Sequence, residues 1–241
     1  MSIPFRPIAR VLARTLRPAP YVDISALESI LPIFEKNSHG QGVLITVNHY
    51  SAPGFHAWWF VILISAFIPA RIHWVVTSGW TNSCWLTGIS HWLFPRVASL
   101  FGFTPMPAMP PDPDQIEQRA EAVRAVLKYA RDTQQPVIGL APEGGDASGG
   151  VLSSLPPGVG RFIHLLNPEC PWILPVGVWK EDGQIYLKFG CPYQMDVLES
   201  LTRHERDQRV GDNVMNHIAL LLPEQLRGNY NIKILRGLKK P

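Results

Sequence analysis

The chain has 241 residues and contains only three cysteines, Cys84, Cys170 and Cys191, with no C-x-x-C pair among them. An odd number of widely spaced cysteines supports neither a disulfide framework nor a zinc ribbon. Sparse use of cysteine is typical of proteins in a reducing compartment, so we expect a cytoplasmic location.

Charge is also scarce. Only 17% of the residues are Asp, Glu, Lys or Arg, against about 25% in a typical soluble domain. The net charge of +3 is mild and no basic stripe is present, so we expect no nucleic-acid partner. A small positive excess does fit an anionic substrate or an anionic lipid surface. The apolar content of 46% fits either a membrane-facing surface or a large dry core.

A long apolar run is missing as well. The strongest candidate is the segment 57–70, which would reach roughly 21 Å as a helix at 1.5 Å per residue. A bilayer-spanning helix needs about 20 consecutive apolar residues. We therefore expect this segment to form a buried or half-inserted helix.

The first 35 residues contain a short amphipathic pattern between Pro7 and Pro18. Basic and aliphatic side chains fall on opposite faces of the expected helix: Arg6, Arg10, Arg14 and Arg17 against Ile8, Leu12 and Leu16. One interpretation is a membrane-attachment segment over residues 1–35, lying on an anionic surface and followed by a single domain over 36–241. The other is an ordinary amphipathic helix packed on that domain.

From residue 42 onward, strand-like and helix-like segments alternate. Strands are expected at 43–47, 72–77, 137–140, 172–178 and 184–189, and helices at 55–68, 85–101, 116–131, 159–166 and 206–222. The segment 103–113 contains five prolines and is expected to be a loop. Strands separated by helices predict an α/β fold, with a largely parallel sheet flanked by helices on both faces.

Polar residues follow two of the expected strands. Asn48 and His49 come directly after strand 43–47, where a histidine can act as a general base at neutral pH. A satisfied structural histidine is the alternative for this segment taken alone. The second group is the turn 139–150, GLAPEGGDASGG, in which Glu143 lies at the bend. Its glycines allow a close approach of main-chain N–H groups to a ligand, and an exposed glycine-rich loop is again the alternative.

The two groups together resemble the motifs of the lysophospholipid and glycerol-phosphate acyltransferases. Asn48, His49 and Ser51 match the opening of that family's N-H-x-x-x-x-D motif. The second family motif, F-P-E-G-T-R-S, is matched by Pro142, Glu143 and Gly144. The resemblance extends over residues 40–190 and implies a glycerolipid-acyltransferase-like fold.

The resemblance also has departures. The family aspartate that orients the histidine falls at Gly54, and the family Thr-Arg pair falls at Gly145 and Asp146. Glu143 and Asp146 are therefore the candidates for orienting His49. Arg161, at the start of an expected helix, is the candidate for replacing the missing phosphate-binding arginine.

The resemblance implies an O-acyltransferase in which His49 is the general base. The enzyme would move a fatty acyl group from an acyl-CoA or acyl carrier protein thioester to a hydroxyl of a lysophospholipid or related lipid. It would need no cofactor beyond that thioester and would lie peripherally at the cytoplasmic face of a membrane. A catalytically weak or inactive acyl- or lipid-binding protein on the same fold is the alternative. A third hypothesis is a metal site that contains His49 and His56.

Overall fold

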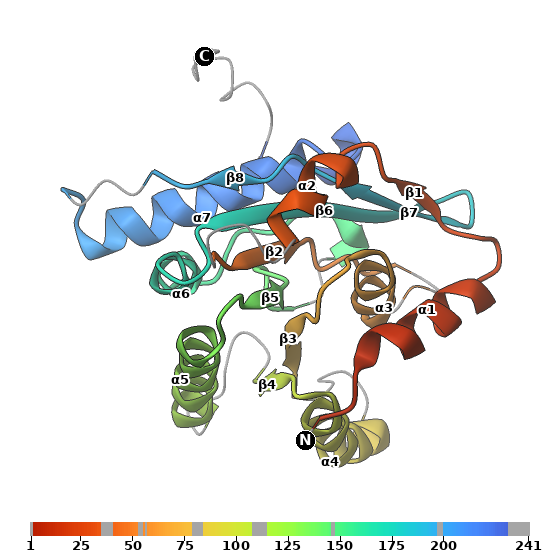
Figure 1. Ribbon diagram of the computed structural model, residues 1–241, viewed down its shortest axis with the longest axis horizontal. Coiled ribbons are helices and arrows are strands. Elements are labelled where there is room, and N and C mark those ends of the chain that lie inside the picture. The colour runs from red at the N-terminus through yellow and green to blue at the C-terminus, as the bar shows by residue number, and fades with distance from the viewer. Residues whose placement is uncertain are drawn as a thin grey trace.

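A computed structural model describes residues 2–34, 41–52, 55, 57–78, 84–107, 115–145, 148–196 and 200–230. Within these residues one sheet has the strand order β1-β7-β6-β2-β5-β3-β4, and β8 pairs with β6 (Figure 1). The strands are β1 Tyr21–Asp23, β2 Val43–Val47, β3 His73–Thr77, β4 Thr104–Met106, β5 Val137–Leu140, β6 Trp172–Glu181, β7 Gln184–Phe189 and β8 Tyr193–Gln194.

The strand pairing confirms the expected fold class. β2 runs parallel to both of its neighbours, β5 and β6, and β3 runs parallel to β5 and β4. Among the described strands, the antiparallel pairs are β6 with β7 and β6 with β8. Because β2 and β5 are parallel neighbours, their carboxyl ends lie at the same edge of the sheet.

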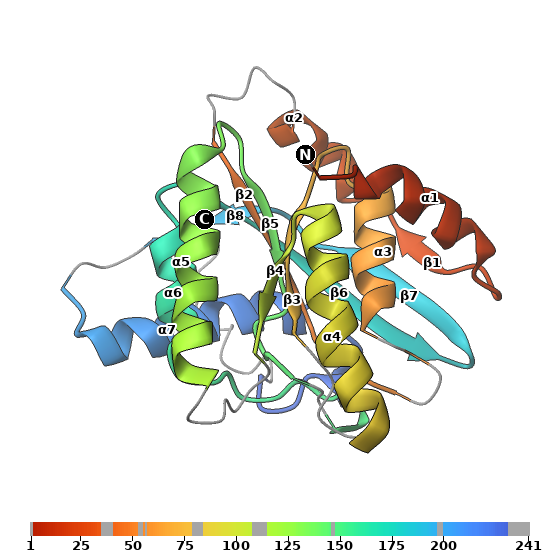
Figure 2. The same cartoon turned by 90° about the horizontal axis from the view of Figure 1, so that it is seen from below.

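Seven helices accompany the sheet in the described part of the chain. They are α1 Phe5–Thr15, α2 Leu27–Phe34, α3 Trp58–Phe67, α4 Cys84–Phe101, α5 Ile116–Asp132, α6 Val159–Leu166 and α7 Arg203–Ala219. Figure 2 shows α5, α6 and α7 on one side of the sheet, and α1, α3 and α4 on the other.

The two faces of the sheet bury separate apolar cores. Alternate residues of β2 divide between them: Val43, Ile45 and Val47 pack with α3, whereas Leu44 packs with α5, α6 and α7. This is the period-two alternation of a strand, with both faces covered. The mostly apolar segment 57–70 supplies α3, whose Leu63 and Ile64 are fully buried.

The N-terminal residues belong to the same sheet and core. β1 pairs with β7, and α1 packs against α3 through Ala9, which is fully buried beside Ile62 and Ala66. Ala13 packs against the same cluster. The attachment of residues 1–35 to a membrane stays a prediction.

The loop expected over 103–113 is partly wrong. Thr104–Met106 forms β4, which pairs with β3. Its Pro105 lies on an edge strand, where proline is tolerated because no further strand needs its missing N–H. The short elements β1, α2 and β8 were not expected either. Within the part of the chain that the structure describes, none of the helices has the length and apolarity needed to span a bilayer.

Helices α6 and α7 approach one another at Gly160. A Cβ atom there would lie 1.9 Å from the carbonyl oxygen of Asp207 and 2.9 Å from the N atom of Gly211. Both atoms belong to the backbone, so a side chain at this position would force the helices apart.

Gly160→Ala should therefore lower the free energy of unfolding by about 3 kcal/mol, at the upper end of overpacking costs, despite alanine's better helix propensity. Urea unfolding of the purified protein measures this change. The neighbouring exposed residue supplies the control, because Arg161→Ala should stay within about 0.5 kcal/mol of wild type. Equal stabilities of the two variants would contradict the close packing.

Candidate active site

Of the three residues that follow β2, Asn48 and Tyr50 are anchored by their side chains. Asn48 is 1% exposed, and its side chain bonds both main-chain groups of Val178 on β6: its Nδ2 donates to the carbonyl and its Oδ1 accepts from the N–H, each at 2.8 Å. Tyr50 is also buried, and its hydroxyl donates to the carbonyl of Lys180, 3.1 Å away. The side chains before and after His49 are thus both fixed on β6.

His49 is partly exposed between these two anchors. Its imidazole lies edge-on to the ring of Phe60, with centroids 5.9 Å apart and an interplanar angle of 74°. An apolar wall on one side and fixed backbone neighbours restrict where the ring can point. His49 is thus a partly exposed residue at the carboxyl edge of the sheet, and its Nδ1 is shielded from solvent.

Glu143 joins the turn that follows β5 to the residues that follow β2. The carboxylate is 4% exposed, and its Oε2 accepts the main-chain N–H of His49 at 2.6 Å. Its Oε1 accepts the main-chain N–H and the hydroxyl of Ser153, at 2.9 and 3.2 Å. The turn after β5 and the turn after β2 therefore converge, and one buried carboxylate links both of them to the segment at 153.

Burial raises the pKa of Glu143 above its ordinary value of 4.5, and the N–H groups of Ser153 and His49 partly offset this rise. The contacts explain why the carboxylate is tolerated inside the protein, since a buried charge needs hydrogen-bond partners. In the contacts described here, Glu143 holds the main chain of His49.

The turn that carries Glu143 is built from conformationally special residues. Pro142 is buried, and Gly144 has a φ of 70°, in the left-handed region that favours glycine. Gly150 also has a positive φ, and a side chain there would collide with the ring of Tyr50. Ser51 and Gly145 are partly buried at the two turns.

Arg161 occupies a different environment from the one expected of a phosphate ligand. Its side chain is exposed, and its main-chain N–H donates to Asp207 on α7 at 2.6 Å. The same carboxylate accepts from the N–H of Gly158 at 2.7 Å. The amino end of α6 is thus already satisfied by a carboxylate of the chain itself.

Three residues of the sequence argument, Gly54, His56 and Asp146, lie outside the described residues. No group of three or more metal-ligating side chains occurs in the described ranges. Sequence reasoning missed the contributions of Ser153, Tyr50 and Val178. Tyr50 stands inside the first motif and could have been considered, whereas Ser153 carries no motif and becomes visible only through its contact with Glu143.

No protein-family model matches the chain, and no curated protein matches it by sequence. The crystal structure of the 1-acyl-sn-glycerophosphate (LPA) acyltransferase PlsC from Thermotoga maritima is similar in fold, with a TM-score of 0.47 and 14% sequence identity. The match covers 83% of this chain and 71% of that one.

The raised pKa of Glu143 has a measurable sign. The folded state binds this proton more tightly than the unfolded state, so Glu143 should make stability fall as pH rises from 4.5 through its raised pKa. The difference in unfolding free energy between wild type and Glu143→Gln, measured in urea from pH 4 to pH 7, isolates this contribution.

Glu205 supplies a control of opposite sign. The pKa of Glu205 is lowered mainly by a hydrogen bond from the side chain of Thr202, and further by one from the N–H of Thr202. Its contribution to stability is therefore present above pH 4.5 and is lost as pH falls through the lowered pKa. The wild-type minus Glu205→Gln difference should thus rise as pH increases toward 4.5 and stay level above it. A Glu143 difference with the same slope as Glu205 would contradict the burial argument.

Proposed function

We propose that the chain is an O-acyltransferase that moves a fatty acyl group from an acyl thioester to a hydroxyl of a lysophospholipid or related lipid acceptor. The observation that carries this proposal is the convergence of the turns that follow β2 and β5. The main-chain N atom of His49 lies 2.6 Å from Oε2 of Glu143. The two motifs that resemble those of the glycerolipid acyltransferases therefore form one site.

In the proposed reaction, a ring nitrogen of His49 takes the proton of the acceptor hydroxyl. The oxygen forms a bond to the thioester carbonyl carbon, the carbon–sulfur bond breaks, and the leaving thiolate takes the proton back from the imidazolium. The donor is an acyl-CoA or acyl carrier protein thioester, and no further cofactor enters the reaction.

This chain has Asp146 at the position where the resembling family has an arginine, and its Arg161 is exposed. This composition favours a neutral or polyhydroxylated acceptor over a phosphorylated one. Acceptors of both kinds belong in any assay.

His49→Ala should lower turnover of acyl-CoA with the best acceptor by about 10²- to 10⁴-fold, the usual contribution of a general base. Release of the free thiol measures the rate across a panel of lysophospholipids and neutral glycerolipids. Because His204 is exposed on α7, His204→Ala should leave the rate unchanged. A turnover rate that survives His49→Ala would refute the mechanism.

A binding protein without catalysis is the second candidate. It is favoured by the use of both Glu143 oxygens as acceptors for His49 and Ser153, a structural role for the acid of the site. This alternative predicts that acyl thioester binds without turnover and that His49→Ala leaves the binding constant unchanged. The same proteins, tested by equilibrium binding, separate the two candidates.

Membrane attachment through α1 is also proposed, and the packing of α1 supports it. The small Ala9 faces α3, whereas Ile8, Val11 and Leu12 are 38%, 62% and 36% exposed. A helix that merely packs on its domain would bury its large aliphatic side chains instead. The neighbouring α4 adds a further row of exposed apolar side chains: Trp92, Leu93, Val97 and Leu100.

Val11→Ser should weaken binding to vesicles of phosphatidylcholine and phosphatidylglycerol by about tenfold, the loss expected for one inserted aliphatic side chain. Ile116, 61% exposed on α5 across the sheet, gives the matched control, since Ile116→Ser should change nothing. Co-sedimentation with vesicles measures both. Equal losses in the two variants, or no vesicle binding by wild type, would refute attachment through α1.

A further inference from the structure

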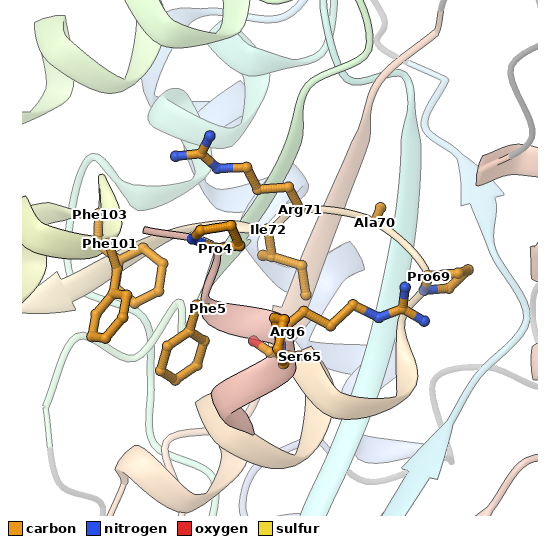
Figure 3. Close-up of a pocket in the computed structure, with 11 residues that line it drawn as sticks. Pro4, Phe5, Arg6, Ser65, Pro69, Ala70, Arg71, Ile72, Phe101 and Phe103 are labelled. Carbon is orange, nitrogen blue, oxygen red and sulfur yellow. The ribbon is translucent and has the colours of Figure 1, made fainter. Parts of the chain in front are cut away.

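A cavity of about 280 Å³ lies at the opposite end of the sheet from His49. It is lined by the amino end of α1, the carboxyl end of α4 and the segment 69–72, which enters β3 (Figure 3). Since β3 is parallel to β5, the start of β3 and the turn at Glu143 are at opposite edges of the sheet. The cavity is therefore separate from the candidate active site.

The charge of this cavity is all of one sign. Two of its described lining residues, Arg6 and Arg71, are basic, and none is acidic. The amino end of α1 also lines it, has no capping side chain, and carries no acidic residue in its first turn. The N–H groups of Phe5 and Arg6 at this helix start add partial positive charge, whereas Pro4 and Pro7 have no N–H.

Arg6 is the least satisfied of these groups. Its Nε is shielded from solvent and has no hydrogen-bond partner among the described residues. Burial, and then the nearby charge of Arg10, lower the pKa of Arg6. The other two arginines of this region do have contacts: Arg71 donates to the hydroxyl of Ser2, and Arg10 donates to the carbonyl of Ala66. An anion in the cavity would meet the positive charge of the Arg6 guanidinium, which has no acidic partner among the described lining residues.

One wall of the cavity is aromatic. The ring of Phe5 lies 4.8 Å from that of Phe101 and 5.3 Å from that of Phe103, both edge-on. Figure 3 shows the three rings gathered together, with the side chain of Arg6 leading away from them toward Pro69. A ligand that meets both surfaces must be charged at one end and apolar at the other.

We propose that this cavity binds an anionic amphiphile, with a phosphate or carboxylate head at Arg6 and the start of an apolar chain on the three phenylalanine rings. Its volume is close to the lower bound of about 300 Å³ for small-molecule sites, so it holds a head and a short length of chain. An anionic lipid headgroup and free phosphate both carry the negative charge that this site would bind.

Calorimetric titration of the full chain with octyl phosphate, octyl glucoside and inorganic phosphate tests the proposal. Octyl phosphate should bind at least tenfold more tightly than either of the others. Arg6→Gln should weaken the binding of octyl phosphate by about tenfold or more, because one charge-assisted hydrogen bond is lost. Arg14→Gln removes the same charge from an exposed position on the same helix, and should change affinity less than twofold.

A second variant keeps both cations. Ala70 lines the cavity, and the larger side chain of Ala70→Leu should fill part of it. This variant should bind octyl phosphate more weakly, while its thermal unfolding stays cooperative. Equal losses in Arg6→Gln and Arg14→Gln would overturn the proposal, as would octyl glucoside binding as tightly as octyl phosphate. If inorganic phosphate binds as tightly as octyl phosphate, the cavity is a free-phosphate site and the proposal of an amphiphile is overturned. His49→Ala should leave binding unchanged, so this result stands apart from the acyl-transfer assay.

Discussion

The contact between the Glu143 carboxylate and the main-chain N–H of His49 determines the geometry at the carboxyl edge of the sheet. Parallel pairing brings β2 and β5 to the same edge, but it places no restraint on the chain beyond the last paired residues. The carboxylate supplies that restraint, because a buried charge requires donors and finds them on His49 and Ser153. One side chain thereby holds the residues after β2 to its own turn and to Ser153, and the imidazole extends from a fixed backbone.

Asn48 extends this restraint to β6. Its side-chain amide replaces a strand partner for Val178, whose N–H and carbonyl would otherwise lie buried without acceptors or donors at the point where β2 has ended. Tyr50 adds a second tie to β6 two residues later. Of these three residues only His49 is partly exposed, and the buried side chains on either side of it fix the position of its main chain.

Much of this arrangement could be predicted from the sequence, and the reason is local. Val43–Val47, Val137–Leu140 and Val159–Leu166 are short elements whose apolar residues are bounded by turn residues, so their limits follow from pattern alone. β4 could not be found this way, because Pro105 contradicts strand propensity and an edge position becomes known only from the whole sheet. The partner of the Glu143 carboxylate was equally hidden, since a main-chain N–H has no sequence signature. The pairing of Arg161 with Asp207 depends on α7 crossing α6, a long-range contact that periodicity does not report.

Helix α1 contributes both an exposed apolar face and one wall of the cavity. Its alanines allow a close approach to α3, and this choice leaves the larger Ile8, Val11 and Leu12 outside. The same close approach brings the first turn of α1 against the end of α4, where Phe5 meets Phe101 and the cavity forms. An outward apolar face and an arginine-lined cavity therefore have one structural cause, small side chains at the α1–α3 contact. A larger residue at Ala9 would disturb both features together while leaving the carboxyl edge of β2 and β5, which α1 does not form, in place.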